Sequence, residues 1–269
     1  MDRIRPIAAG VALGCCAALV PCRAAPDSFP GFAPSSATPA ADAAPASAAV
    51  APSGAWSRLQ AKPGFGTGLV DAYLVGAVLG LADYAGLHRV DHPVRQETSG
   101  IWSIAKAGQF PAELIGLTAA GAIWTGGRSR FGRTLWQSLD AAAMAGISTQ
   151  ALKWTFQRTR PSDTTNPDLW FQGIHNQSFP SGDVSSITAL VTPIILEYHR
   201  TDPGVDALAA IPVYDMVARM KAHGHWLTDT LAGAAVGVVS GWIAHRAHSP
   251  FILGLLPHGF DIGLREHFR

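Results

Sequence analysis

Beyond Trp56 the chain consists of apolar stretches of helical length that are separated by turn residues. Stretches in which apolar and polar residues alternate, as they do in half-buried strands, are few. The pattern therefore predicts an all-α protein, folded as a compact helical bundle of about six helices. The expected helices cover residues 68–87, 112–124, 132–156, 184–199, 205–221 and 227–245.

The charges within these stretches bear on whether they cross a bilayer, because each crossing needs about twenty predominantly apolar residues. Asp71 and Asp83 lie in the first expected helix, and Asp215 lies in the fifth. Only the last helix, which is uncharged from Thr230 to His245, comes close to the requirement. The sequence favours a bundle that is soluble or peripheral to a membrane over a polytopic protein.

The first 25 residues have the features of an export signal. Arg3 and Arg5 precede an apolar run, and small residues follow it up to Ala25. We predict a signal peptide at residues 1–25 and an exported protein, located in the periplasm or at the outer face of a membrane. An uncleaved membrane anchor and an acylated lipoprotein are the alternatives. All three cysteines lie in this segment, so the mature chain would have no thiol for a disulfide or for catalysis.

Composition divides the rest of the chain. Residues 26–54 are dominated by alanine, proline and serine, which is the composition of a disordered, flexible linker. Residues 55–250 hold the expected helices and form the predicted domain, and residues 251–269 form a C-terminal tail. The net charge is +1 and only 14% of residues are charged. A nucleic acid is therefore excluded as a partner, because no broad basic surface is available.

Two segments carry groups suited to an anion. Lys153 and Arg160 are seven residues apart, so on one helix both side chains would face the same side, and Pro161 would end that helix. Further along, a turn-forming cluster that contains Ser181 and Gly182 leads into an apolar stretch. It predicts a helix start, whose backbone N–H groups suit a phosphate. An ordinary N-cap, formed by Ser181 or Asp183, is the alternative.

The third segment runs from Ala218 to Asp229, and Gly224 is expected to break a helix within it. His225 and Asp229 are four residues apart, a spacing that lets a carboxylate hold one imidazole nitrogen while the other attacks or transfers a proton. His223 lies close to His225, but further ligands at a recognisable spacing are lacking. We therefore predict no metal and no cofactor.

Taken in order, the three segments resemble the signature of the type-2 phosphatidic acid phosphatases, whose fold is shared with bacterial class A acid phosphatases and vanadium haloperoxidases. That signature reads K-x(6)-R-P, then P-S-G-H, then S-R-x(5)-H-x(3)-D. Residues 153–161 match the first block fully, and residues 180–182 match three of the four positions of the second. The third block is matched except that Ala218 replaces its serine.

The resemblance implies a phosphatase-like helical domain and a reaction. In it His225 attacks phosphorus to give a phosphohistidine, Asp229 orients the imidazole, and water releases phosphate without a metal. The phosphate pocket, which stabilises the charge that develops in transfer, would be formed by Lys153, Arg160, Ser181, Gly182 and Arg219.

The departure from the family is Asp183, which stands where the signature has the histidine that protonates the leaving oxygen. An aspartate among three cations should be ionised, and it would then repel a phosphate and have no proton to donate. Three outcomes remain open. Burial could make Asp183 an acid at low pH, another group such as His223, His175 or Tyr214 could substitute, or catalysis could be lost. We expect Asp183→His to raise turnover.

The expected function is that of an exported, metal-independent phosphohydrolase acting on a lipid phosphate or diphosphate. The alternatives are a soluble acid phosphatase for small phosphomonoesters, a catalytically impaired phosphate-binding protein and, more distantly, a haloperoxidase. The expected partners are a phosphate-bearing lipid and, peripherally, a membrane; the oligomeric state is left open. Several apolar residues near the motifs would suit a lipid but are more often core: Trp154, Trp170, Phe171, Phe179 and Trp226.

Overall fold

The structure is a computed structural model that describes residues 64–105 and 108–247. The predicted signal peptide, linker and C-terminal tail lie outside the described residues. The domain boundaries at residues 55 and 250 also lie outside them and stay predictions.

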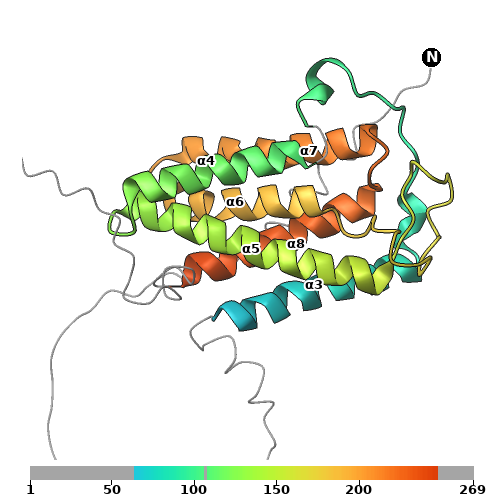
Figure 1. Cartoon of the computed structure of the whole chain (residues 1–269), viewed down its shortest axis with the longest axis horizontal. Coiled ribbons are helices and arrows are strands. Elements are labelled where there is room, and N and C mark those ends of the chain that lie inside the picture. The colour runs from blue at the N-terminus through green and yellow to red at the C-terminus, as the bar shows by residue number, and fades with distance from the viewer. Residues whose placement is uncertain (1–63, 106–107, 248–269) are drawn as a thin grey trace, which may run out of the picture. The chain divides into compact units, whose positions relative to one another are not determined.

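Within the described residues there are six α-helices and no strand, which confirms the predicted all-α class. Figure 1 shows them arranged as a bundle, with α6 between α4 and α8 in this view. The α-helices are α3 (Phe65–Ala85), α4 (Gln109–Thr125), α5 (Arg130–Phe156), α6 (Gly182–Tyr198), α7 (Ala210–Lys221) and α8 (Leu227–Arg246). Three 3₁₀ helices connect them: η1 (Leu87–Val90), η2 (Gly100–Ser103) and η3 (Pro203–Ala209).

The ends of these helices follow from local capping. α5 begins two residues earlier than expected because Ser129 is its N-cap, and the Ser129 hydroxyl accepts a hydrogen bond from the Gly132 N–H. The helix expected over residues 205–221 is divided into η3 and α7. The division starts at Asp202, whose carboxylate accepts from the Gly204 N–H and begins a 3₁₀ segment.

Glycines spaced four residues apart on α8 set its distance from α6. Gly233, Gly237 and Gly241 share one face of the helix. A Cβ atom on Gly233 would lie 2.5 Å from the backbone oxygen of Ser181, and one on Gly237 would lie 2.5 Å from that of Ser185. Only glycine permits this approach. The starts of α6 and α8 are thereby held together, and the Ser181 N–H donates to the Asp229 carbonyl at 3.0 Å.

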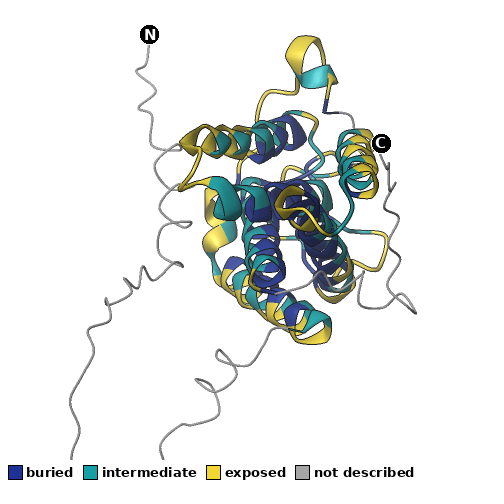
Figure 2. Ribbon diagram, turned by 90° about the vertical axis from the view of Figure 1, so that its left-hand side faces the viewer, coloured by how far each residue is buried: buried dark blue, intermediate teal, exposed yellow. Residues whose placement is uncertain are grey.

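The apolar core lies between α3, α5, α6 and α8, and Figure 2 shows the buried residues gathered in the centre of the bundle. Burying one large aliphatic side chain stabilises a fold by about 1.5–3 kcal/mol. The largest members of the core cluster are Met144, Leu152, Phe156, Trp170, Phe179, Val236 and Ile243.

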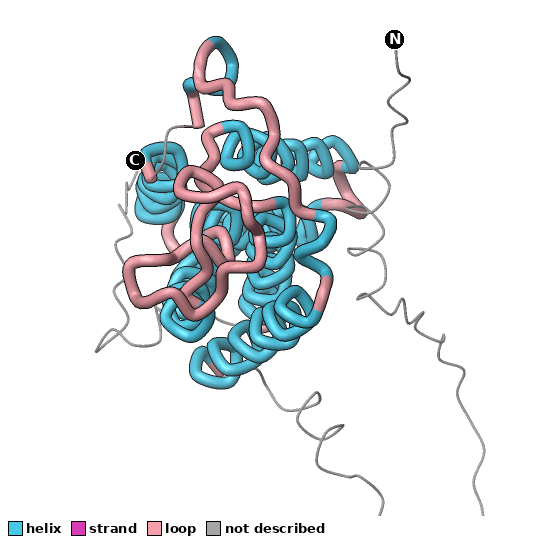
Figure 3. The backbone as a smooth tube through the Cα atoms, turned by 90° about the vertical axis from the view of Figure 1, so that its right-hand side faces the viewer, coloured by secondary structure: helices cyan, strands magenta, loops and turns pink. Residues whose placement is uncertain are grey.

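Three loops gather at one end of the bundle, as Figure 3 shows: the segment after α3, residues 157–181 and residues 222–226. A backbone hydrogen bond joins the last two of them, from the Ser162 N–H to the His223 carbonyl at 2.9 Å. Within residues 157–181, the Ser178 N–H donates to the Arg158 carbonyl at 3.0 Å. The predicted site residues lie in these loops and at the adjoining helix ends.

By length and composition alone, α3 and α8 are apolar enough to cross a membrane. In its most apolar window α3 is 22% buried within the domain, whereas α8 is 61% buried. The carboxylate of Asp83, which the sequence argument counted against α3, is buried and bound to Arg158 inside the domain. The outer face of α3 instead exposes Val70, Leu74, Val78 and Leu81.

Candidate active site

His225 lies immediately before α8, in a buried position. Its Nδ1–H donates to the backbone carbonyl of Ser178 at 2.7 Å, which leaves Nε2 as the nitrogen that can attack. Burial lowers the pKa of the imidazole well below 6.5, and the positive charges of Lys153, Arg160 and Arg219 lower it further. At neutral pH the ring is therefore neutral and carries the lone pair that a nucleophile needs.

The predicted contact between Asp229 and His225 is wrong in its detail. The Asp229 Oδ2 lies 3.9 Å from the His225 Nδ1, which is too long for a hydrogen bond. Asp229 is the third residue of α8, and its Oδ2 accepts from the Trp226 N–H at 2.9 Å, so it caps the helix. The same oxygen accepts from the Ser178 hydroxyl. Asp229 thus fixes Ser178, whose carbonyl in turn holds His225.

Lys153 is buried near the end of α5, beside the start of α6. Its Nζ donates to the Gln177 carbonyl at 2.6 Å, and its Cε lies 3.7 Å from where a Cβ of Gly182 would be. Burial lowers the pKa of the ammonium to about 8, with a second contribution from the Arg160 charge. Lys153 is therefore still a cation at neutral pH.

Arg160 does not lie on the helix that carries Lys153, contrary to the prediction from their spacing. α5 ends at Phe156, because Gln157 adopts the left-handed conformation with φ of 46° and caps the helix. The loop nevertheless returns Arg160 to the same place. Its Nη1 lies 3.9 Å from where a Cβ of Gly224 would be, next to His225. The two cations converge through a loop, not through helical periodicity.

Ser181 is the N-cap of α6, but its hydroxyl makes no capping hydrogen bond. The Oγ atom is buried and has no hydrogen-bond partner among the described residues. An unsatisfied buried hydroxyl costs about 1–3 kcal/mol, so a ligand oxygen there would be stabilised. This position of the Ser181 hydroxyl, beside the N–H groups at the start of α6, is compatible with the phosphate contact that the sequence predicts.

Arg219 lies between two carboxylates. Its Nε and Nη2 each lie 3.0 Å from the Asp215 Oδ1, and its Nη1 lies 3.0 Å from the Asp183 Oδ2. Burial raises the pKa of Asp215 to about 6, although Arg219 opposes the shift. Asp183, at the first turn of α6, thus contacts the guanidinium that the resemblance assigns to the phosphate.

Two of the three groups proposed to replace the missing histidine bind backbone carbonyls, and the third is exposed on a loop. The Nε2–H of His223 donates to the Val94 carbonyl at 2.7 Å, and the Tyr214 hydroxyl donates to the Ile101 carbonyl. His175 is exposed on the loop between α5 and α6. His223, with φ of 56°, is also the left-handed residue after α7, a position expected for Gly224.

Arg158 is a functional candidate that the motifs do not reveal. It is fully buried and binds carboxylates from three parts of the chain. Its Nη1 lies 3.0 Å from the Asp83 Oδ2 and 2.7 Å from the Asp229 Oδ1, and its Nη2 lies 2.8 Å from the Asp91 Oδ2. Arg158 therefore ties α3 and the loop after it to the start of α8.

This ion cluster reaches the nucleophile through two further residues. Arg158 binds Asp229, Asp229 binds the Ser178 hydroxyl, and the Ser178 carbonyl binds His225. The guanidinium also stacks on the Trp170 ring, with 4.4 Å between its carbon and the ring centroid. No signal in the sequence could have identified this arrangement, because the three carboxylates are widely separated along the chain.

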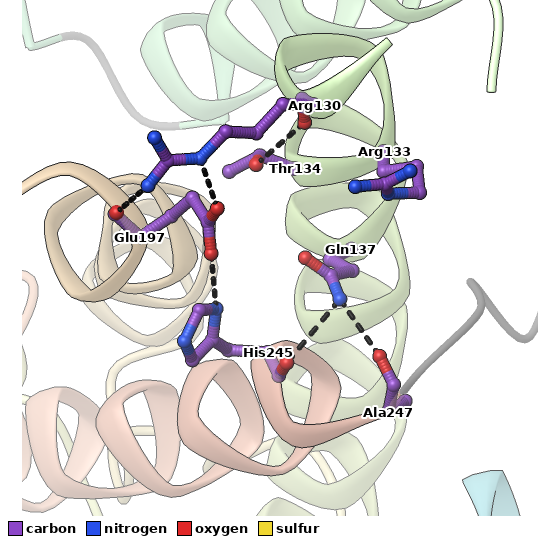
Figure 4. A pocket seen from close by; sticks show the side chains of 7 residues that line it. All are labelled: Arg130, Arg133, Thr134, Gln137, Glu197, His245 and Ala247. Carbon is purple, nitrogen blue, oxygen red and sulfur yellow. Dashed lines mark hydrogen bonds and ion pairs between the residues drawn. The ribbon is translucent and has the colours of Figure 1, made fainter. Parts of the chain in front are cut away.

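A second polar pocket lies at the opposite end of the bundle, where α5 begins and α6 and α8 end (Figure 4). Arg130 is ion-paired with Glu197 there, and the Gln137 amide donates to the carbonyls of His245 and Ala247. These polar groups bind one another, and the pocket contains none of the motif residues. We assign it no chemistry.

Comparisons with known proteins point to one superfamily. A family model described as the PAP2 superfamily matches residues 134–252, which include all three motif segments. A lipid A 1-phosphatase of Porphyromonas gingivalis is 29% identical over 121 residues, which is 44% of this chain. The match covers 25% of that relative, so the chain spans about a quarter of its length.

A solved structure is also similar. It is the crystal structure of the first transmembrane PAP2 type phosphatidylglycerolphosphate phosphatase from Bacillus subtilis. The sequence identity is 19% and the TM-score is 0.45, and the match covers 65% of this chain and 93% of that chain.

Proposed function

We propose that this chain is a phosphohydrolase that removes a phosphate from a lipid phosphate or diphosphate, because residues 134–252 match the model of the PAP2 superfamily. The observation that supports this most is the convergence of three cations on one neutral imidazole. Lys153, Arg160 and Arg219 each lower the pKa of His225, and such a group of positive charges beside a neutral imidazole suits an anionic substrate.

In the proposed reaction the three cations and the Ser181 hydroxyl hold the phosphate oxygens. The lone pair on the His225 Nε2 forms a bond to phosphorus, and the bond from phosphorus to the leaving oxygen breaks. The Ser178 carbonyl keeps the proton on Nδ1 and stabilises the positive charge that the ring acquires. Water then attacks the phosphohistidine, the electron pair returns to Nε2, and orthophosphate leaves. No step in this scheme uses a metal.

Exposed apolar residues support a lipid substrate and contact with a membrane. Phe171 is exposed beside the site loops and packs against Tyr84, with ring centroids 5.5 Å apart. Trp154, the residue after Lys153, is 58% exposed. Aromatic residues with one apolar and one wet side suit a membrane interface. The relative named lipid A 1-phosphatase supports the same class of substrate. The other three aromatic residues near the motifs are core.

The outer face of α3 supports the same proposal, because four large apolar side chains follow one another there at helical spacing. This apolar face, together with the export signal predicted at residues 1–25, leads us to propose an enzyme that works at the outer face of a membrane. The alternative of an impaired phosphate binder is favoured by one observation, the ion pair between Asp183 and Arg219.

The proposed function is tested by measuring orthophosphate release from purified full-length protein. The substrates are phosphatidate and an alkyl diphosphate in mixed micelles, and p-nitrophenyl phosphate in solution. Release from the lipids at a higher kcat/KM than from the soluble ester supports a lipid phosphatase. Preference for the soluble ester would instead indicate an acid phosphatase, and background rates on all three would indicate a binder.

The pH dependence of this activity is expected to report Lys153. Because the pKa of Lys153 is lowered to about 8, its charge is present below that pH and is lost as the pH rises through it. We expect kcat/KM, which reports the free enzyme, to fall above about pH 8. In Lys153→Arg the fall should move beyond pH 10, because a guanidinium keeps its proton. The same decline in both proteins would show that another group titrates.

A further inference from the structure

Asp183 is the most exposed of the three groups that meet at the start of α6, which are Ser181, Asp183 and Arg219. Its side chain is 25% exposed, whereas that of Arg219 is 3% exposed and Ser181 is fully buried. In transfer the attacking and leaving atoms lie roughly in line, so the leaving oxygen is on the far side of phosphorus from His225. A lipid chain attached to that oxygen has to extend towards solvent, and of these three groups only the Asp183 side chain reaches solvent to a substantial extent.

The carboxylate at this position holds no proton for a leaving group. The Asp183 Oδ2 lies 3.0 Å from the Arg219 Nη1, and an ion pair with a guanidinium requires the ionised form. Among the described residues, the other acids near the site are engaged by neighbouring groups, and Asp215 is fully buried against Arg219. The His223 Nε2 and the Tyr214 hydroxyl bind backbone carbonyls, and the buried Lys153 Nζ donates to the Gln177 carbonyl.

The need for a proton depends on the leaving group. Hydrolysis of an alkyl monophosphate expels an alkoxide, which is about as basic as hydroxide, since water has a pKa of about 15.7. Hydrolysis of a diphosphate instead expels a monophosphate, whose second pKa is about 6 and which leaves unprotonated at neutral pH. A general acid is worth about 10²–10⁴-fold in rate, and only the first reaction loses that factor here.

We propose that Asp183 makes this protein selective for diphosphates, whose leaving oxygen needs no proton, over phosphomonoesters. This inference rests on the proposed function. The His225 Nε2 bonds to the terminal phosphorus, the bridging P–O bond breaks, and its electron pair stays on the departing monophosphate. Water then adds to the phosphohistidine and gives one orthophosphate. Asp183 repels the inner phosphate, but solvent around the partly exposed Asp183 side chain weakens that repulsion, so the missing proton donor remains the larger effect.

The test uses dodecyl diphosphate and dodecyl monophosphate with full-length protein. Wild type is expected to release one phosphate from the diphosphate and to accumulate dodecyl monophosphate, with kcat/KM at least about 10²-fold lower on the monophosphate. In Asp183→His, which adds a proton donor, kcat/KM on the monophosphate should rise about 10²-fold or more. From the diphosphate the variant should release close to two phosphates, where the wild type releases one.

Asp183→Asn keeps the test decisive if the histidine variant does not fold. It removes the negative charge without adding an acid, so kcat/KM on the monophosphate should stay at least about 10²-fold below that on the diphosphate. Loss of monophosphate turnover alone in this variant would show that Asp183 is itself the acid and overturn the inference. If the wild-type kcat/KM values on the two substrates agreed within about tenfold, the inference about Asp183 would also be overturned, but the proposed function would not be affected. Equal rates for wild type and His225→Ala on both substrates would overturn the proposed function as well.

Discussion

Replacing His225 by alanine is expected to reduce phosphate release from every substrate by at least about 10³-fold. The variant removes the only protein atom proposed to form a bond to phosphorus, whereas the cations proposed to bind the phosphate remain. KM should therefore change much less than kcat. The measurement is a steady-state assay of orthophosphate on an alkyl diphosphate, with rapid acid quench to detect a phosphorylated protein in the wild type.

The matched control is His199→Ala. His199 follows α6 and pairs with Asp206 on the surface, at the end of α6 away from Ser181. This variant should retain wild-type kcat and KM. If His225→Ala retained more than a tenth of wild-type activity, His225 would not be the nucleophile, and the reaction would have to begin with direct attack by water.

Arg158→Met is expected to destabilise the fold by about 3–5 kcal/mol, because it leaves three buried carboxylates without their cation. For a domain of this size the thermal midpoint should fall by about 6–20 °C. Residual folded protein should also have a lower kcat, because Asp229 would no longer be held in place beneath Ser178. Thermal unfolding followed by circular dichroism measures the first effect, and kinetics below the midpoint measure the second.

Arg130→Met is the matched control for the loss of an arginine in an ion pair. Arg130 pairs with Glu197 near the solvent, so its removal should shift the midpoint far less. The loss in Arg158→Met should also be smaller at pH 5 than at pH 8. Burial already raises the pKa of Asp83 to about 6, and without the cation the carboxylates take up protons more readily as the pH falls. Equal decreases of the thermal midpoint in Arg158→Met and Arg130→Met would refute a special role for the buried ion cluster around Arg158.

The helices are predictable from the sequence because their apolar stretches are long and sharply bounded. Apart from the start of α7, each end predicted from the sequence lies within three residues of the end in the structure. The start of α7 differs because Asp202 nucleates a 3₁₀ segment, which shares its composition with an α-helix. The glycines of α8 are visible in the sequence. The sequence does not show that they pack against α6, because that contact forms only in the folded protein.

The sequence predicts which residues belong to the candidate site, but it does not predict the hydrogen bonds and ion pairs that hold them. The motifs bring together Lys153, Arg160, Arg219 and His225, whose roles stay predictions. The spacing of Lys153 and Arg160 suggested a shared helical face, yet a left-handed Gln157 ends the helix between them. The spacing of residues in a motif identifies the residues that belong to it. It does not show which of their side chains point into the site.

The partners of His225 and Arg158 lie beyond the reach of such patterns. The imidazole is held by a backbone carbonyl, and any residue at position 178 would supply one. The carboxylates around Arg158 are separated from it by up to 75 residues along the chain. The pair of Asp215 and Arg219 is different, because a spacing of four on a helix is a recognisable signal that brings opposite charges together.

The central claim is that one tetrahedral anion is held between His225 and the three cations. Orthovanadate tests it most directly, because vanadate adopts the five-coordinate geometry of phosphoryl transfer. An experimental structure with vanadate should show vanadium bonded to the His225 Nε2, with its oxygens bound by Lys153, Arg160 and Arg219. Vanadate bound elsewhere, with the Arg219 ion pair to Asp183 intact and His225 untouched, would contradict the account.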